Sequence, residues 1–219
     1  MNNDVKKAIE DNIDLIEDER FDELYSKLHI GVHIGKFTKT LLDAEVLDVY
    51  RLTRLPEYFL AFVDDPSFEI AIPGKVKTVP SNAFEYSNVR SVVLEKGIRT
   101  IQANAFNRCK SEEFILPSTI KAIGASAFQF SNIKSIDIPE GVKTINKLSF
   151  YDCLELKSVK IPSSIIKISD SAFSHCQDLD ITYNGTKADW QSIFNRKAFY
   201  KSTFVCHCTD GDINYPQSK

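Results

Sequence analysis

Apolar residues in the middle of the chain recur with a period of 22 to 23 residues. Five phenylalanines set the period, at intervals of 22, 22, 22 and 23 residues: Phe84, Phe106, Phe128, Phe150 and Phe173. Twelve residues before each of them stands an aliphatic residue: Ile72, Leu94, Leu116, Ile138 and Ile161. A fixed period of this length predicts a solenoid in which each turn buries its core only against the neighbouring turns.

Each repeat predicts one short strand that ends at the aliphatic residue. The expected strands cover residues 68–72, 90–94, 112–116, 134–138 and 157–161, with a last one near 180–183. In four repeats a proline follows, and proline ends a strand because it cannot donate to the ladder. Six parallel strands at about 4.8 Å spacing would form a sheet roughly 24 Å across. The Ala-Phe segment should then turn on the opposite side.

The repeats resemble a known family. The segments "AFQFSNIKSIDIPEGVKTI" and "SFYDCLELKSVKIPSSIIKI" are similar to the BspA-like (Treponema pallidum-type) leucine-rich repeat over about residues 66–190. The segment "ITYNGTKADWQSI" is similar to the usual end of such arrays. The resemblance implies a right-handed solenoid of five to six repeats, classed as α+β, and a role in binding.

Both ends of the array need covering, because a bare first turn would expose an apolar face and a strand edge. Residues 1–65 have helical periodicity and predict a capping domain, residues 66–182 hold the repeats, and residues 183–219 form a second cap. In the second cap, Thr186 should start a short helix anchored by Trp190. A β-hairpin is expected around Asp210-Gly211. The apolar positions of the three predicted N-terminal helices are Val5, Ala8, Ile9, Ile13 and Ile16; Phe21, Leu24, Tyr25 and Leu28; and Phe37, Leu41, Leu42, Ala44 and Leu47.

Composition is that of a globular chain: 219 residues, 43% of them hydrophobic, with a formal charge of −3. That charge is too small to indicate nucleic acid or membrane as a bulk partner. No apolar run approaches the roughly 20 residues of a membrane span. The first 20 residues are acidic and lack an apolar signal core, so we expect a cytoplasmic location unless a signal has been removed.

Charge is unevenly divided along the chain. Residues 1–24 hold nine acids and three bases, a net charge of −6, so the remainder carries +3. Such an acidic segment is typical of a solvated helix face. It could also recruit a basic partner or dock within the molecule.

The positions of the cysteines and histidines indicate structural roles and not catalysis or metal binding. Cys109, Cys153 and Cys176 share a repeat column with Ser87 and Ser131, and a buried thiol behaves as a small hydrophobe. A Cys153–Cys176 bridge remains possible under oxidation. Cys206 and Cys208 should face one side of a strand with His207 on the other, which is poor geometry for zinc. With His29, His33, His175 and His207 scattered and no nucleophile or phosphate motif present, we predict no enzyme activity, no metal and no cofactor.

One repeat departs from the pattern. Ser111 stands where the other repeats carry Val89, Ile133, Leu156 and Leu179. Phe114 is the largest residue in its own column. We interpret the pair as a volume-conserving exchange within one turn.

Binding residues are expected at outward positions, where packing of the core does not determine the residue type. Val93 and Ile115, with Ala71, predict an apolar strip on the outward, concave side of the strands, and a charged rim around such a strip is typical of protein-binding patches. The strip also fits a simple preference of β-branched residues for strands, or burial under the cap. The candidate residues are Phe68, Ala71, Arg90, Val93, Glu113, Ile115, Lys134, Asp137, Lys157 and Lys160.

Two further columns are secondary candidates. A basic stripe could engage an acidic surface or phosphates, or simply be solvated. Two aromatic residues in a turn column, Tyr86 and Phe130, are candidate anchors. The members of the stripe are Lys77, Arg99, Lys121 and Lys143.

Two functions follow. The first is a non-enzymatic protein-interaction module, an adaptor or inhibitor of bacterial, phage or protist context. The second is an assembly protein that self-associates or attaches to a larger particle through its caps.

Overall fold

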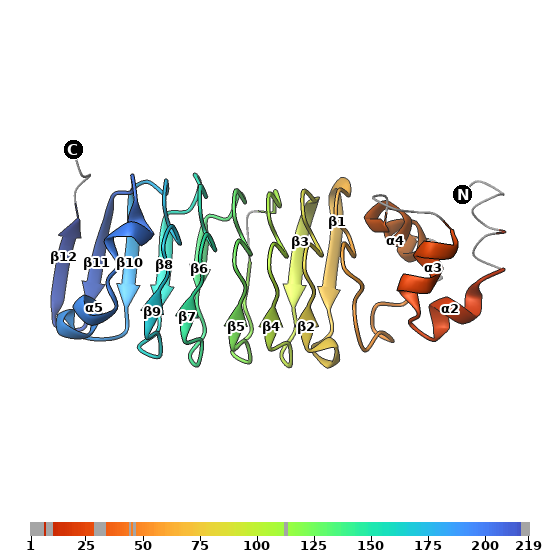
Figure 1. The fold of residues 1–219 in the computed structure, drawn as a ribbon, viewed down its shortest axis with the longest axis horizontal. Helices are drawn as coiled ribbons and strands as arrows, with labels where there is room; N and C mark the ends of the chain where they lie inside the picture. The colour runs from red at the N-terminus through yellow and green to blue at the C-terminus, as the bar shows by residue number, and fades with distance from the viewer. Residues whose placement is uncertain are drawn as a thin grey trace.

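The computed structural model describes residues 7, 11–28, 34–43, 45, 47–111 and 114–215. It is an elongated parallel solenoid of about six turns with short helices at the N-terminal end (Figure 1), which confirms the predicted fold class. His29, His33, Ala44, Glu113 and the apolar positions Val5, Ala8 and Ile9 lie outside the described residues.

Three short helices lie at the N-terminal end: α2 (Ile13–Glu17), α3 (Phe21–Lys27) and α4 (Ile34–Asp43). The predicted apolar positions Phe21, Leu24 and Leu41 are fully buried. The Tyr25 hydroxyl lies 3.1 Å from the Thr38 hydroxyl and links α3 to α4. These helices share one hydrophobic core with the repeats.

The segment "PEYFLAF" connects the N-terminal helices to the first repeat. Leu60 N–H donates to Ala83 O, and Phe62 N–H donates to Glu85 O. The same pattern recurs one turn later, from Phe84 N–H to Ala105 O. Residues 58–63 therefore have the backbone of a repeat turn, although they lack its consensus.

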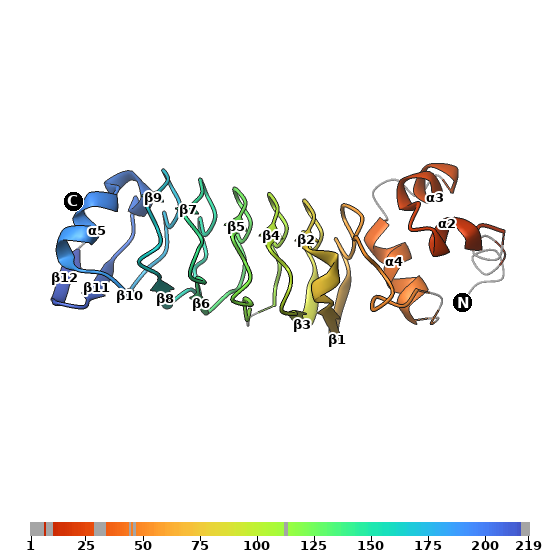
Figure 2. The same ribbon diagram turned by 90° about the horizontal axis from the view of Figure 1, so that it is seen from below.

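The predicted strands occur in all but one repeat. They are β1 (Asp64–Ile72), β3 (Asn88–Leu94), β6 (Ser135–Asp137), β8 (Ser158–Ile161) and β10 (Leu179–Tyr183). β11 (Phe204–Cys208) adds a further parallel strand, and β12 (Gly211–Tyr215) closes the predicted hairpin in antiparallel pairing. Viewed from below, these strands line one side of the stack (Figure 2).

The described part of the predicted strand 112–116 is not a strand. Residues 114–117 form none, and among the described residues β1–β3 is separate from the five-stranded sheet β12-β11-β10-β8-β6, which corrects the prediction of one continuous sheet. At this level the Ser111 hydroxyl donates to Val89 O of the preceding turn at 2.7 Å. Phe114 turns inward and lies 5.0 Å from Phe106 and 5.2 Å from Phe128, ring centroid to ring centroid.

A second side of each turn carries two-residue strands. β2 (Thr78–Val79), β4 (Thr100–Ile101) and β5 (Ala122–Ile123) pair in parallel, preceded by the 3₁₀ turn η2 (Gly74–Val76). β7 (Thr144–Ile145) and β9 (Lys167–Ile168) form a separate pair. Between β5 and β7 a side chain bridges the turns, since Asn146 Nδ2 donates to Ile123 O at 2.7 Å.

The third side is an unbroken stack of phenylalanine rings. Neighbouring rings from Phe84 to Phe173 have centroids 5.0 to 5.4 Å apart and interplanar angles of 5° to 11°. Phe199, in η3 (Arg196–Phe199), continues the stack 5.2 Å from Phe173. Phe59 closes the other end edge-on to Phe84.

The serine and cysteine column lies beside this stack. The Cys153 thiol donates to Phe128 O at 3.0 Å, and the Cys176 thiol donates to Phe150 O at 3.1 Å. Ser202 repeats the contact with Phe173 O at 2.6 Å. The column therefore selects a small side chain that can satisfy the carbonyl of a phenylalanine in the preceding turn. All five cysteines are free thiols.

The C-terminal end is closed as the sequence predicts. α5 (Lys187–Ile193) starts with a capping box in which Thr186 Oγ1 accepts from Asp189 N at 3.2 Å. Trp190 is fully buried and packs against Tyr183 and Phe199. The domain limits at residues 65 and 182 remain predictions. They fall within β1 and β10, and the coiling of the solenoid continues on both sides of each limit.

Candidate binding surface

The strands present one outward set of side chains, which we call the strand face. Along β8 and β10 exposed and buried residues alternate strictly, so Ser158, Lys160, Asp180 and Thr182 point away from the core. The corresponding positions of β1 are Glu69 and Ala71, and Ala71 is half-buried. These outward side chains do not pack in the core, so core packing does not determine which residues stand there.

An apolar strip lies on this face in the first three repeats. Ala71 and Val93 are direct partners in the β1–β3 pair. Val93 is 46% exposed and Ile115, in the segment that interrupts the sheet, is 75% exposed. The predicted strip is therefore open to solvent.

Charged residues of the strand face are paired across strands. Arg90 Nε lies 3.1 Å from Glu69 Oε1, and Lys160 Nζ lies 2.7 Å from Asp137 Oδ2. Lys157 Nζ lies 3.9 Å from Asp178 Oδ2. Lys134 also has an interaction partner. Among the described residues, the charges of the predicted rim are therefore largely paired, and the apolar strip is what distinguishes this face.

Phe68 lies at the junction with the N-terminal helices. The Lys39 ammonium stands 4.2 Å from the centroid of its ring, and the same ammonium lies 3.0 Å from Asp65 Oδ2. Hydrogen bonds from Ser67 and then from Lys39 lower the pKa of Asp65 to about 2. Phe68 is half-buried there, so it differs from Ile115 in having an internal partner.

The far end of the strand face carries a histidine between two carboxylates. His207 Nδ1 lies 2.8 Å from Asp212 Oδ1, and Nε2 lies 3.3 Å from Asp180 Oδ1. The hydrogen bond with Asp212 raises the pKa of His207. His207 and Asp180 border a shallow cavity of about 550 Å³ that also touches Val205 and Tyr215. The sequence indicated only the outward direction of His207, since its two acids come from strand pairing.

Cys206 and Cys208 lie on the opposite side of the same strand, as predicted. Their sulfur atoms are 3.8 Å apart, and Cys206 is fully buried. Within the described ranges, no three histidine, cysteine or acidic side chains gather as a metal ion would require. In that part of the chain, no helix has the length and apolar character to cross a membrane.

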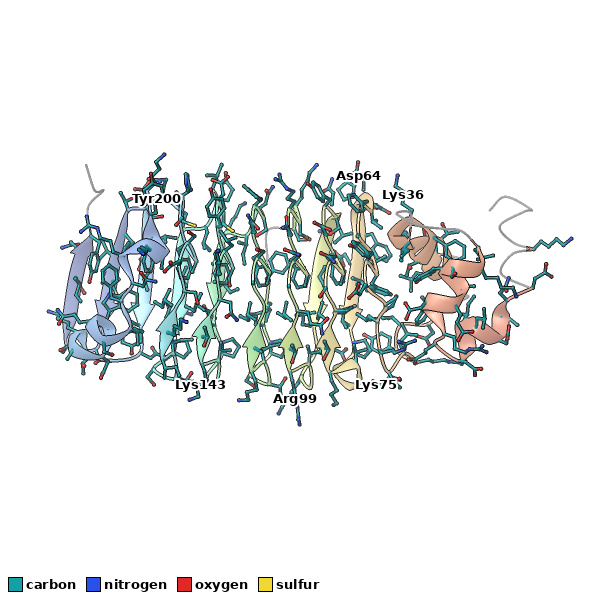
Figure 3. All side chains as sticks on the ribbon, in the orientation of Figure 1. Lys36, Asp64, Lys75, Arg99, Lys143 and Tyr200 are labelled. Carbon is teal, nitrogen blue, oxygen red and sulfur yellow. The ribbon has the colours of Figure 1, made fainter. Side chains whose placement is uncertain are left out.

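The predicted basic stripe forms one edge of the solenoid, which we call the basic edge. Its members are Lys77, Arg99, Lys121 and Lys143, all exposed. Backbone bonds from Arg99 N to Lys77 O and from Lys121 N to Arg99 O place three of them on successive turns. Figure 3 shows Arg99 and Lys143 projecting along the same margin as Lys75. Among the described residues, no carboxylate forms an ion pair with these four side chains.

The opposite edge carries an aromatic ridge. Phe62 and Tyr86 stack with centroids 5.2 Å apart, and the Arg108 guanidinium lies over both Tyr86 and Phe130. The ridge continues by ring contacts through Tyr151, His175 and Tyr200. Tyr86 and Phe130 therefore have internal partners. The sequence places Arg108 in the same turn column as Tyr86 and Phe130, but its contact with both rings was not predicted.

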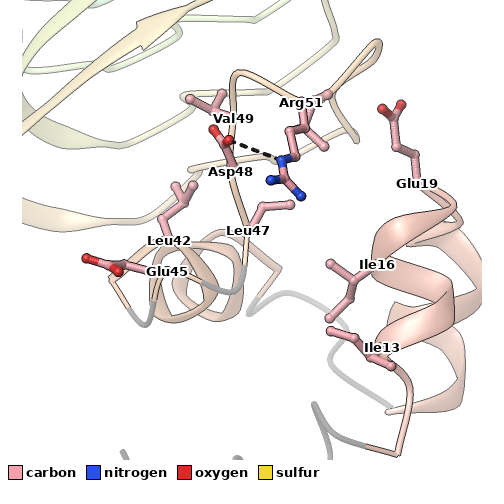
Figure 4. A pocket seen from close by; sticks show the side chains of 10 residues that line it. Ile13, Ile16, Glu19, Leu42, Glu45, Leu47, Asp48, Val49 and Arg51 are labelled. Atoms are coloured by element: carbon pink, nitrogen blue, oxygen red, sulfur yellow. Dashed lines mark ion pairs between the residues drawn. The ribbon is translucent and has the colours of Figure 1, made fainter.

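A further cavity, of about 700 Å³, lies among the N-terminal helices (Figure 4). Ile13, Ile16 and Leu47 contribute apolar walls. Asp48 and Arg51 stand at its margin as an exposed ion pair, with a 3.5 Å contact. Sequence periodicity gave no signal for it, because its walls come from two separate stretches of the chain, residues 13–19 and 42–52.

Comparison with solved structures finds bacterial leucine-rich repeat proteins. The pneumococcal vaccine antigen PcpA is 24% identical with a TM-score of 0.49, over 53% of this chain and 30% of that chain. A leucine-rich repeat protein from Eubacterium ventriosum is 14% identical with a TM-score of 0.46, over 74% of this chain and 62% of that one. A leucine-rich cell surface protein from Faecalibacterium prausnitzii is 23% identical with a TM-score of 0.34, over 52% of this chain and 40% of that one. The chain thus spans less than two thirds of each of these proteins.

A search of curated proteins finds no match. The family model described as "BspA type Leucine rich repeat region" matches residues 60–180 in six copies. That segment is more than half of the chain, and it coincides with the turns that carry the phenylalanine stack. The chain belongs to the BspA-type leucine-rich repeat family.

Proposed function

We propose that this chain is a non-enzymatic protein-interaction module that binds its partner through the strand face, with Val93 and Ile115 as apolar anchors. One observation carries the proposal: Ile115 is 75% exposed beside Val93, on a surface where the neighbouring charges are already paired. Large apolar side chains exposed together on a rigid surface are typical of interaction sites.

The cross-strand ion pairs define what kind of partner fits. Because Glu69–Arg90 and Asp137–Lys160 are mutually neutralised, a partner gains little from opposing charge near the strip. It gains more by burying Val93 and Ile115 under an apolar side chain of its own. The partner we propose therefore presents a compact apolar protrusion with a polar surround, which matches the usual interface anatomy of apolar core and polar rim.

The test places a photo-crosslinking residue at position 115 and compares the captured protein with that from position 154. Leu154 is 60% exposed, so it is a matched apolar residue outside both the strand face and the basic edge. We expect a discrete adduct from position 115 that position 154 does not give. We also expect Ile115→Glu and Val93→Glu to abolish binding of the purified captured protein without changing the melting temperature, while Leu154→Glu binds normally.

Two results would contradict the proposal. One is normal binding by both strand-face variants. The other is equal loss of binding in Leu154→Glu, which would indicate that any added charge on the solenoid interferes.

A further inference from the structure

The four cations of the basic edge form a column of like charge. Consecutive turns lie about 4.8 Å apart, so Lys77, Arg99, Lys121 and Lys143 span roughly 14 Å. Like charges directly opposite one another on neighbouring strands are destabilising. The cost could be avoided by pairing with carboxylates, as Arg90 and Lys160 do on the strand face.

This edge lacks such carboxylates. In the arc that contains it, residues 73–78 and their equivalents in the next four turns, the sequence has seven cations and two acids, Glu95 and Glu140. Glu95 accepts a hydrogen bond from the Tyr50 hydroxyl at 3.2 Å. Lys121 Nζ reaches only the main-chain oxygen of Glu140, at 3.3 Å. The positive charge of the edge is therefore open to a partner.

A complementary surface exists on the same chain. Asp11, Asp14, Asp18 and Asp22 are all exposed, and among the described residues none of them forms an ion pair. Asp14 lies in α2, Asp18 follows its last residue and Asp22 lies in the first turn of α3, so these carboxylates gather at the N-terminal helices. We call them the acidic cap. Its neighbours Glu19 and Glu23 differ, since Thr53 and Arg20 respectively occupy their carboxylates.

The two surfaces do not meet within one molecule. α2 and α3 lie beyond the first turn, at the end of the long axis, whereas the basic edge runs along the side of the stack (Figures 1 and 3). Among the ion pairs of the described residues, none joins the acidic cap to the basic edge, so both charged surfaces are available to another molecule.

We propose that the acidic cap of one molecule docks on the basic edge of a second copy of this chain. Each molecule offers one cap and one edge, so the contact is heterologous and does not close on itself. The expected product is a series of head-to-side oligomers. Because the contact is built from exposed charges, it should be weak and sensitive to salt. This interface shares no residue with the strand face, so it stands independently of the proposed partner site.

The test is sedimentation of the full chain over a range of concentrations at low and high salt. We expect the mean mass to rise with concentration at about 0.01 M salt, where charges act over about 30 Å, and to return to the monomer near 1 M. Arg99→Glu/Lys121→Glu and Asp14→Lys/Asp18→Lys should each lower the association constant by about tenfold or more. The matched control for the edge variant is Lys110→Glu/Lys201→Glu, which makes the net charge more negative by the same amount at other exposed positions.

Mixing the two reversed variants is the decisive measurement. The unchanged cap of the edge variant can pair with the unchanged edge of the cap variant, and the two reversed surfaces are also complementary. The mixture should therefore associate again, although each variant alone is monomeric. Thermal melting of every variant reports whether it is folded.

Several results would overturn the proposal. They are a monomeric wild-type chain at the highest concentration in low salt, association that persists in either reversed variant, or a mixture that stays monomeric. Binding of heparin without self-association would assign the edge to a different polyanion and would also overturn it. Ile115→Glu should associate as the wild type does, which separates this contact from the strand face.

Discussion

The guanidinium carbon of Arg108 lies 4.1 Å from the ring centroid of Phe130. It lies 5.3 Å from the centroid of Tyr86 on the preceding turn, so one cation joins two turns of the aromatic ridge. We expect Arg108→Ala to lower the free energy of unfolding by about 1 kcal/mol, since an exposed cation–π contact contributes about 0.5–1 kcal/mol. Chemical denaturation measures the change. Lys110→Ala is the control, and an equal effect there would contradict a specific role for Arg108.

The exchange between Ser111 and Phe114 can be tested by reverting it. Phe114→Ala should lose about 3–5 kcal/mol of stability, because the ring is buried between Phe106 and Phe128. Ser111→Leu alone should lose about 1–3 kcal/mol by overpacking. Ser111→Leu/Phe114→Val should lose less than the sum of Ser111→Leu and Phe114→Val. A gain in melting temperature for Ser111→Leu alone would mean that the two residues do not compensate.

Thiol reactivity should follow burial. Burial raises the pKa of Cys153 to about 12, and burial likewise raises the pKa of Cys109 and Cys176. The reactive thiolate is thus scarce at neutral pH. We expect an aromatic disulfide reagent to modify the half-buried Cys208 first, and Cys208→Ser to remove the fast phase. Rapid modification of Cys153 in the native protein would be incompatible with this arrangement.

Leu148 adopts a left-handed backbone conformation, with φ of 60°. The equivalent positions of the first two repeats are Asn82 and Asn104, and asparagine tolerates this region better than leucine. Leu148→Asn should therefore stabilise the protein by up to about 1 kcal/mol. Leu148→Ala keeps the steric cost and is the control. An asparagine variant no more stable than the alanine variant would indicate that packing of Leu148 outweighs the backbone term.

The pair His207–Asp212 should make stability depend on pH. The hydrogen bond with Asp212 raises the pKa of His207 in the folded state above its unfolded value of about 6.5. The resulting stabilisation is complete below the unfolded pKa and is lost as pH rises through the folded pKa. Asp212→Asn should thus lower the melting temperature more at acidic than at basic pH. Asp137→Asn, which removes a partner of Lys160, should show no such trend in this range.

Repeat periodicity predicted most of the architecture, because equivalent residues of successive repeats occupy the same structural environment. Phe84 and its equivalents stack in register, and Cys153 and Cys176 take the place of serine as the column requires. The departure of residues 114–117 from strand geometry was not predicted, although Ser111 and Phe114 are unusual in the sequence. Residue volume predicts their exchange, whereas the hydrogen bond from Ser111 to Val89 O depends on backbone geometry.

Surface candidates were harder to judge from sequence alone. Val93 and Ile115 are exposed as the strand alternation indicates. Phe68 instead meets Lys39, and Arg90 meets Glu69. Those contacts join residues 29 and 21 positions apart, so no local pattern reveals them. The acids around His207 depend likewise on the register of β10, β11 and β12.

The interruption near the third repeat has a mechanical consequence. There the described residues 114–117 form no strand, and the short ladder on the second side stops between β5 and β7. In the part of the chain that the structure describes, the phenylalanine side is the one that stays continuous, through the ring contacts of Phe106, Phe128 and Phe150. We expect the solenoid to bend most easily at the third repeat, about an axis that lies along the continuous phenylalanine side. Ile115 stands on the side that opens or narrows as the rod flexes, so curvature and access to the apolar strip would change together.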